Sequence, residues 1–513
     1  MRYVQDPQFG EIIDYSYLKN EIKGVIDQLT PEYNLLGSLY AATENFQDDP
    51  NYMTATAASG LAYTMLLAAE ETELAEKHKY DIFTLGWTEE HCGTDLLSIY
   101  TKATPLSDDP AERQFHIKGN KWIINNSYHA DYHMVLAKID PTQDGPRSLS
   151  IFLVPQSSTK NWERIETHVL KHMVLTKYDI DGPGILVGKL GHGLSILQRM
   201  AMPSKYQCTY GGMIMAREAI PATIEHLSSK FIFGDHPTNF SNVFRQLYNL
   251  SLSTAFVKFT FFRALALSDS SFLQFHGTML KSWLLLYINE LLRENLLVAG
   301  SKGFVKESVI GRGAIDSFVF PVFDGHYTLN TLMSAKHINR YIDAERQEDA
   351  AARIEFLKEN MYIAKPGNQM SASSGSIRKP DFFNWAEYLG QLDIDLPFSP
   401  ENLLSKVNEF LKAIDVNELS NDLDYKYKIG QLLQGLEAIL ASCEMVAILG
   451  EAYYNIIPQQ YNRYINMFNE YLCESAFEIE LISPVRQRKL EQPADVRGYL
   501  LDLLDVRNKI QNS

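Results

Sequence analysis

The sequence has no excess of basic residues and no long uncharged apolar run. Its 47 Lys and Arg residues stand against 63 Asp and Glu residues, which gives a formal net charge of −16. A nucleic-acid-binding surface needs a basic face, so this balance argues against nucleic acid as a partner. The lack of an apolar run of about 18 residues argues against a membrane span, and the acidic start argues against a signal peptide. We therefore expect a cytoplasmic globular protein.

Cysteines are few and widely spaced. The four of them, Cys92, Cys208, Cys443 and Cys473, form no Cys-x-x-Cys pair. A disulfide framework or a zinc site needs closer, paired spacing, so we expect buried, reduced thiols and no metal site.

The pattern of apolar residues changes along the chain and divides it into parts. Residues 1–80 show helical spacing at 15–29 and 55–78, which predicts an N-terminal helical domain. Residues 81–188 consist of short alternating or apolar runs broken by Gly, Asn, Asp and Pro. Such runs predict a β-barrel-like middle domain.

The remainder of the chain returns to helical spacing. Residues 189–341 contain four long stretches with apolar residues three and four apart, which predicts a four-helix bundle. Residues 342–513 add further helices as a C-terminal extension, with a Gly-, Ser- and Pro-containing linker at 365–380. The expected fold class is therefore mostly α with a central β domain.

The predicted β domain opens with the loop WTEEHCGTD at 87–95. It is similar to the TEPxxGSD loop of the acyl-CoA dehydrogenase superfamily. In that loop Thr and Ser hydroxyls lie along a flavin, and the Gly permits close approach of the backbone. The resemblance implies that four residues contact the cofactor: Trp87, Thr88, Gly93 and Thr94.

A second segment, GNKWIIN at 119–125, resembles the GxKxWITN motif of the same superfamily. The Trp of that motif flanks the isoalloxazine ring, and Trp122 matches it. The Thr that lies beside the flavin N5 is replaced by Ile124, so a hydroxyl is missing from this position. The resemblance implies cofactor contacts for both residues.

Two lysines occupy arginine positions in the predicted bundle. Lys205 stands where the family has an Arg, and the resemblance implies a role in substrate binding. The segment KFIFG at 230–234 resembles RxxFG, whose Arg binds the flavin pyrophosphate across a subunit interface. Lys230 keeps the charge but loses the bidentate fork of Arg. The resemblance implies cofactor contacts for Lys230 and Phe233, and a homodimer or homotetramer.

The last matching segment is GSKGF at 300–304, followed by Asp-Gly at 324–325. It resembles FGGxGF…RD…YEGT, with Ser301 in place of a Gly and Ile315 in place of the Arg. The resemblance implies that Gly300 and Ser301 contact the cofactor and that Gly325 contacts the substrate. Asp324 falls at the spacing of the family's catalytic Glu, so it is the predicted base.

These resemblances imply a flavin-dependent oxidoreductase of fatty acid metabolism with FAD as its cofactor. Desaturation of an acyl thioester removes a proton from the α carbon and a hydride from the β carbon, and the flavin accepts the hydride. The implied substrates are acyl-CoA or acyl-carrier protein, and an electron-transfer protein is an expected partner. Asp is one methylene shorter than Glu, which displaces the base by about 1 Å and is costly to the rate.

Two other functions remain open. The first is an oxidase of the same fold, such as a nitroalkane or acyl-CoA oxidase. The second is a non-catalytic scaffold, which the substitutions at Ile124, Ser301 and Ile315 favour. Individual residues also have plainer interpretations: Asp324 and Gly325 could form a simple turn, and the two lysines could be solvated surface charges.

Overall fold

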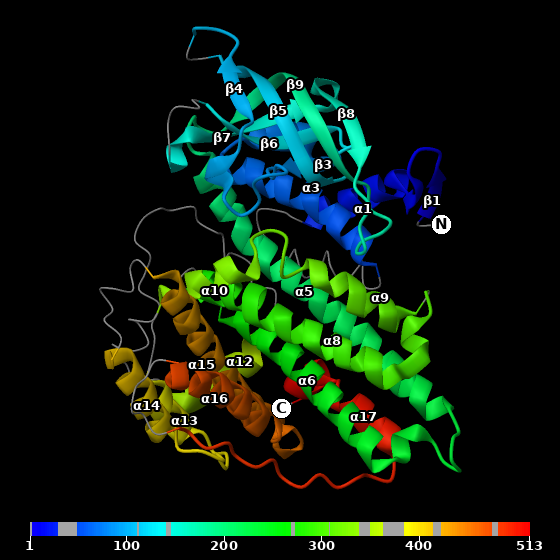
Figure 1. The fold of residues 1–513 in the computed structure, drawn as a ribbon, viewed down its shortest axis with the longest axis vertical. Helices are drawn as coiled ribbons and strands as arrows, with labels where there is room; N and C mark the ends of the chain where they lie inside the picture. Colours follow the sequence, from blue (N-terminus) through cyan, green and yellow to red (C-terminus); the bar gives the residue numbers. More distant parts are fainter. Residues whose placement is uncertain are drawn as a thin grey trace. The chain divides into compact units, whose positions relative to one another are not determined.

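The chain forms two compact units in a computed structural model (Figure 1). The first unit runs from Met1 to Gln207 and the second from Cys208 to the C-terminus, so the boundary lies inside one long helix. The predicted parts 1–80 and 81–188 share the first unit, and 342–513 shares the second with the predicted bundle. The structure describes residues 3–28, 49–109, 112–139, 145–267, 272–306, 308–337, 349–362, 384–413, 422–474 and 481–512.

The N-terminal part of the first unit is mostly helical, as expected. The predicted helix at 15–29 is present, whereas the one at 55–78 is two helices broken near Glu70, whose φ is +65°. A short hairpin before them was not predicted, because four residues per strand are too few for a periodic signal. The elements are β1 (Tyr3–Asp6), β2 (Gly10–Ile13), α1 (Tyr15–Gln28), α3 (Pro50–Ala68) and α4 (Thr72–His78).

The predicted β domain is present as a seven-stranded sheet. Strand β6 pairs with β4 and with β7, and the path β6–β4–β5–β9–β7–β6 closes on itself as a barrel. Alternate apolar residues of these strands point inward and form one core, which is why the sequence alternates. The strands are β3 (Phe83–Gly86), β4 (Lys102–Pro105), β5 (Gln114–Asn125), β6 (Tyr132–Lys138), β7 (Leu149–Pro155), β8 (Thr159–Arg164) and β9 (Leu175–Val187).

A buried histidine lies in the wall of this barrel. The Gln156 side chain donates to the Tyr128 carbonyl, so its Oε1 is left to accept from His133 Nε2–H at 2.6 Å. His133 Nδ1 then accepts from the Tyr178 hydroxyl at 2.9 Å. This arrangement fits the neutral ring, and burial lowers the pKa of His133 to about 4.

We expect the stability of the first unit to fall as pH drops from about 6.5 to about 4. Between these values the unfolded chain binds a proton that the folded His133 does not, so acidification favours unfolding by up to about 3 kcal/mol. Urea unfolding at several pH values measures this slope. His133→Gln should reduce the dependence of the unfolding free energy on pH. His116→Gln, at a strand position whose side chain is 40% exposed, should leave this dependence unchanged. An unchanged dependence in the His133 variant would contradict the prediction.

The second unit is helical, and the predicted bundle is present. The first two predicted helical stretches are one helix, α5, and the charged segment after residue 341 forms α12 as expected. The elements are α5 (Gly193–Ser229), α6 (Ser241–Ala266), α7 (Phe272–Met279), the π-helical turn η5 (Leu280–Leu284), α8 (Leu285–Ala299), η6 (Gly300–Phe304), α9 (Val309–Asp316), η7 (Ser317–Val319), α10 (Tyr327–Ala335), α12 (Ala350–Asn360), α13 (Trp385–Gln391), α14 (Pro400–Ala413), α15 (Leu423–Leu449), α16 (Ile456–Glu474), α17 (Val496–Leu503) and α18 (Val506–Gln511).

Helix α15 lies in the core of this unit, although the sequence places it in the C-terminal extension. Gly430 of α15 faces the Thr331 carbonyl of α10 so closely that a Cβ would not fit. By length and composition α15 is the one helix among the described residues that could span a membrane, and 89% of its most apolar window is buried inside the structure. The predicted linker at 365–380 lies outside the described residues.

A buried ionic network joins α15 to its neighbours. Glu444 accepts from Arg263 of α6, from Arg353 Nε of α12 at 2.7 Å and from the Tyr388 hydroxyl at 2.9 Å. Glu437, two helical turns earlier on α15, accepts from Arg263 as well. Burial alone would raise the pKa of both glutamates, but the arginines outweigh it and hold each pKa below its ordinary value.

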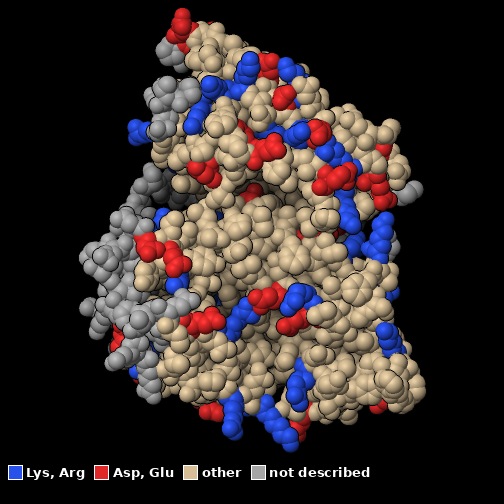
Figure 2. Space-filling view, viewed as in Figure 1, with Lys and Arg blue, Asp and Glu red and all other residues tan. Residues whose placement is uncertain are grey.

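The cysteines agree with most of the sequence expectations, and charges of both signs lie on the surface. All four cysteines are free; Cys473 is exposed rather than buried, and the other three are buried. On the face drawn in Figure 2, basic side chains alternate with acidic ones rather than gathering in one patch. The described residues hold no group of three or more His, Cys, Asp or Glu side chains that could bind a metal ion.

Candidate functional site

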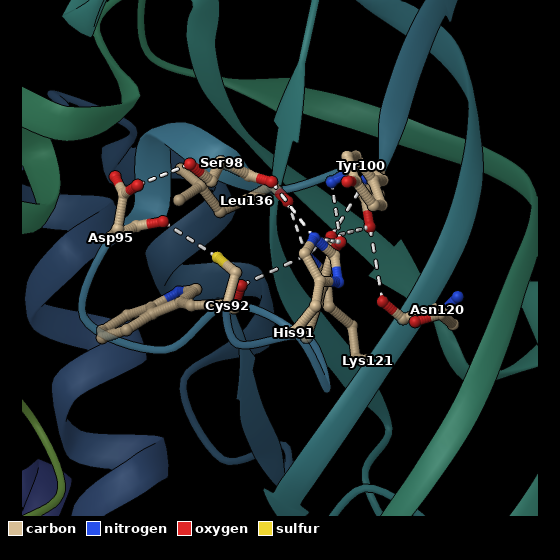
Figure 3. A network of polar contacts seen from close by, with 11 residues as sticks. His91, Cys92, Asp95, Ser98, Tyr100, Asn120, Lys121 and Leu136 are labelled. Carbon is tan, nitrogen blue, oxygen red and sulfur yellow. Dashed lines mark hydrogen bonds and ion pairs between the residues drawn. The ribbon is translucent and has the colours of Figure 1, made fainter.

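The 87–95 loop of the first unit is anchored by a buried ion pair. Lys121 of β5 is fully buried, and its Nζ lies 3.1 Å from Glu89 Oε1 (Figure 3). The same ammonium donates to the Trp87 carbonyl at 3.3 Å and to the Leu136 carbonyl at 2.9 Å. Lys121 therefore ties the start of the loop to the barrel wall.

The carboxylate of the pair holds the far side of the loop. Glu89 accepts from the Tyr100 and Thr101 amides at 2.7 and 3.0 Å and from the Thr101 hydroxyl at 2.6 Å. Burial would raise the pKa of Glu89, but Lys121 and these donors outweigh it and lower that pKa. A buried charge with this many partners fixes the loop, whereas either charge alone would be costly.

The four predicted cofactor residues of this loop differ in what they offer. Gly93 and Thr94 are exposed, and no atom lies within 4 Å of where a Cβ of Gly93 would be. The Trp87 indole Nε1 is buried without a hydrogen-bond partner among the described residues. The Thr88 hydroxyl donates to the Trp122 carbonyl at 2.8 Å, so it is already engaged in holding the loop to β5.

The neighbouring segment of β5 contains a bulge. Lys121 pairs with Tyr178 and Ile124 with Thr176, so Trp122 and Ile123 together oppose the single residue Lys177. A bulge of this kind changes which side chains face outward. Ile123 has a φ of +57° and is 38% exposed.

Two observations bear on the predictions for this segment. Ile124 is buried in the barrel core, where its side chain packs against other apolar residues. Its contact with a cofactor stays a prediction. GNKWIIN is also one residue shorter than GxKxWITN. Counted from Gly119 without a gap, the motif's Trp falls on Ile123 and its Thr on Asn125. Trp122 therefore matches the Trp of the motif only if a one-residue gap is allowed. Without a gap, Ile123 occupies the position of that Trp, and Ile123 is exposed.

Lys205 is not a solvated surface charge. It is 4% exposed in the first-unit part of α5. A lysine buried to this degree needs compensating polar partners, so its position is more constrained than the sequence suggests. Its role in substrate binding stays a prediction.

Two predicted cofactor residues, Lys230 and Phe233, directly follow α5 and lie on an exposed turn. Ile232 and Asp235 bridge across it, with Phe233 and Gly234 at φ +51° and +88°. Phe233 is 95% exposed. Lys230, at the end of α5, accepts at its carbonyl from His236 Nδ1 at 2.6 Å.

Gly300 and Ser301 lie in η6. The same element contains Lys302, which lies near His226, as does Lys230 at the end of α5. Gly300 has a φ of +64° and open space where a Cβ would be, and Ser301 is exposed. Burial, with Lys230 and Lys302 close by, lowers the pKa of His226. The end of α5 and η6 thus bring basic side chains together in this unit.

Asp324 and Gly325 form a left-handed turn before α10. Their φ values are +52° and +93°. Asp tolerates this backbone better than most residues, which is a physical reason for Asp rather than Glu here. Buried Asn330 of α10 holds the turn by donating to the Gly325 carbonyl at 2.9 Å and the His326 carbonyl at 3.1 Å.

A fully buried lysine holds the other side of this turn. Lys281, in the π-helical turn η5, donates to the carbonyls of Phe320 and Phe323, and its Nζ lies 4.9 Å from the Phe323 ring centroid. Phe323 directly precedes Asp324. π-helical turns are rare and frequent at functional sites. The turn therefore does more than connect two helices: a buried charge fixes its geometry.

We expect Lys281→Met to lower the turnover of the chain at least about tenfold, because a displacement of Asp324 by about 1 Å is costly to the rate. The value of kcat should fall more than KM rises, since the substitution moves the carboxylate without removing a substrate contact. Steady-state kinetics measure this, with Lys258→Met as a control at a partly buried lysine elsewhere in the unit. Unchanged kcat in the Lys281 variant would contradict the prediction.

The sequence analysis missed both buried lysines. Lys281 stands alone among apolar residues in MLKSWLLL, and such a lone charge is the signal that could have found it. Lys121 and Glu89 lie within the motifs already noted, but their pairing depends on the sheet register. The structure brings Trp87, Thr88 and Trp122 together in the first unit, and Asp324 with Gly325 in the second.

Comparison with known proteins agrees with this architecture. The family model described as acyl-CoA dehydrogenase, middle domain, matches residues 84–174, which is most of the barrel. The putative acyl-CoA dehydrogenase AidB of Escherichia coli is 29% identical over 161 residues. That match spans 29% of this chain and 27% of the relative, so it covers well under half of either protein.

Solved structures share the fold over most of the chain. An acyl-CoA dehydrogenase from Bacillus anthracis, complexed with FAD, matches 97% of this chain and 90% of its own, with a TM-score of 0.67 and 16% identity. Caenorhabditis elegans ACDH-11, complexed with C11-CoA, matches 90% of this chain and 82% of its own, with a TM-score of 0.68 and 13% identity. The family model therefore matches the middle domain at residues 84–174, and the solved structures show that the chain has the acyl-CoA dehydrogenase fold.

Proposed function

We propose that the chain is a flavin-dependent oxidoreductase that desaturates an acyl thioester, with Asp324 as the base that removes the α proton. The observation that carries this proposal is the Asp324 turn. It combines the spacing of the family's base with a left-handed backbone that Lys281 and Asn330 hold from both sides. A simple surface turn needs no buried ammonium beneath it.

FAD is the cofactor we propose, and the residues present fit it in part. Open backbone at Gly93 and Gly300 permits close approach of a ligand, and the buried Trp87 Nε1 is a donor without a partner among the described residues. Lys230 and Lys302 supply positive charge near one another, as a pyrophosphate requires. When bound, the flavin would accept the hydride.

The protein groups would each have a separate task. Asp324 would accept the proton, and a backbone N–H of the turn would donate to the thioester oxygen. Lys121 and Glu89 keep the 87–95 loop in one conformation, so that Gly93 and Thr94 are presented without reorganisation. Acyl-CoA or acyl-carrier protein as substrate, an electron-transfer partner, a homodimer or homotetramer, and a cytoplasmic location are parts of this proposal.

The visible absorption spectrum of the purified chain tests the proposal. We expect a flavin band that bleaches when an acyl-CoA is added without oxygen. A band that no thioester bleaches, but that bleaches with a nitroalkane, would favour an oxidase of the same fold. The outcome that would overturn a flavin function is a colourless protein that takes up no added FAD.

A non-catalytic scaffold is the second candidate. Two observations favour it: Ile124 lies in the barrel core without a polar group, and the Thr88 hydroxyl is engaged by the Trp122 carbonyl. Both reduce the hydrogen bonds available to a flavin ring. The uptake of FAD by the purified chain separates this candidate from the first, because a scaffold needs no cofactor.

A further inference from the structure

Three asparagines at the start of α16 and along it bind one extended segment of the chain. Asn455, Asn462 and Asn469 are spaced seven residues apart, which is about two helical turns, so they share one face. The segment 481–493 has no helical or strand structure, and it is the red trace that leads into α17 in Figure 1.

Each asparagine binds both main-chain groups of a single residue. Its Oδ1 accepts from the N–H, and its Nδ2 donates to the carbonyl of the same residue. The bound residues are three apart and run antiparallel to the helix. The pairs, with their N–H and carbonyl distances, are Asn469 with Ile482 (3.0 and 2.9 Å), Asn462 with Val485 (2.8 and 2.8 Å) and Asn455 with Arg488 (2.8 and 3.3 Å).

The two spacings match for a geometric reason. A polyproline II helix repeats every three residues and rises about 9 Å in that repeat. Seven residues of α-helix rise about 10 Å. Pro484 lies between two bound residues, where no N–H is needed, so it stiffens the segment without losing a contact.

One side chain of the segment is bound as specifically as its main chain. The Arg488 guanidinium lies 3.3 Å from the Tyr454 ring centroid, bonds Asp395 at 3.0 Å and pairs with Glu451. Stacking on an aromatic ring between two carboxylates is a recognition mode particular to arginine. Ser483, Pro484, Arg486 and Arg488 are all exposed, but only Arg488 has these side-chain contacts among them.

We propose that this face of α16 is a binding site for an extended peptide with an arginine at its third contact position, and that residues 482–488 are its intramolecular ligand. The asparagines form hydrogen bonds only with main-chain groups. The site therefore accepts any residue with a free N–H at the positions of Ile482 and Val485. Selectivity comes from the contacts of the arginine with Tyr454, Asp395 and Glu451. A peptide of this chemistry competes with the chain's own segment.

Binding of a labelled peptide with the sequence of residues 481–490 to the full-length chain tests the proposal. Arg488→Ala and, as a second variant, Val485→Pro each weaken the intramolecular ligand without altering the asparagines. Both variants should bind the peptide at least about tenfold more tightly than the wild type. N-methylation of the peptide at Val485 removes one N–H donor and should weaken binding about tenfold, whereas N-methylation at Arg486 should not.

The matched control uses another asparagine of the same helix. Asn462→Ala in the Arg488→Ala chain should abolish peptide binding, and Asn466→Ala, at an exposed position outside the seven-residue spacing, should not. Circular dichroism verifies that each variant is folded. Equal binding of the peptide methylated at Val485 would overturn main-chain recognition. If neither the Arg488→Ala nor the Val485→Pro chain bound the peptide, the binding site itself would be excluded.

Discussion

Asp324→Ala should lower the turnover of an acyl thioester by about 10²–10⁴-fold while leaving the flavin content unchanged. General base catalysis contributes on this scale, and alanine removes the only group at this position that can accept the α proton. The turn itself should persist, because Lys281 and Asn330 hold main-chain carbonyls rather than the Asp324 side chain. Anaerobic bleaching of the flavin and steady-state kinetics measure the two effects separately.

Two further substitutions at this position serve as controls. Asp324→Asn keeps the shape and the tolerance for left-handed backbone, so its loss of activity would be due to chemistry alone. Asp324→Glu restores the length of the family's base but puts a less suitable residue at φ +52°. Full activity in the Ala variant would exclude Asp324 as the base and leave the turn without a chemical role.

Glu444→Gln should reduce the free energy of unfolding of the second unit by about 3–5 kcal/mol, as expected when one partner of a buried ion pair is lost. Glu444 accepts from Arg263, Arg353 and Tyr388, which come from three different helical segments. Gln keeps the size but leaves two buried guanidinium groups with less compensating charge. Urea unfolding followed by far-UV circular dichroism measures the loss, because this unit is helical.

An exposed ion pair provides the comparison for Glu444. Glu290 pairs with Arg463 at 2.7 Å, but both side chains are largely exposed. Glu290→Gln should therefore change the stability by no more than about 1 kcal/mol. If Glu444→Gln were equally mild, the buried network would not be what attaches α12 and α13 to α15.

Much of the fold could be predicted because its signals are local. The alternation between residues 114 and 125 gave β5, and the three- and four-residue spacing from Gly193 gave α5. The division into four domains stays a prediction. Residues 342–513 were expected as a C-terminal helical extension, and α15 of this extension lies in the core of the second unit, because its apolar residues surround the helix and need burial on every side.

The sequence by itself determined the order of helical, β and helical parts, the position of Asp324 in the chain and the net charge of −16. These follow from residue spacing and composition. Only the tertiary structure decided that Lys121 meets Glu89, that Lys281 lies under the Asp324 turn and that three asparagines of α16 bind an extended segment. The physical reason is that these contacts join residues far apart in sequence, and a single bulge in β5 is enough to turn Ile124 into the core.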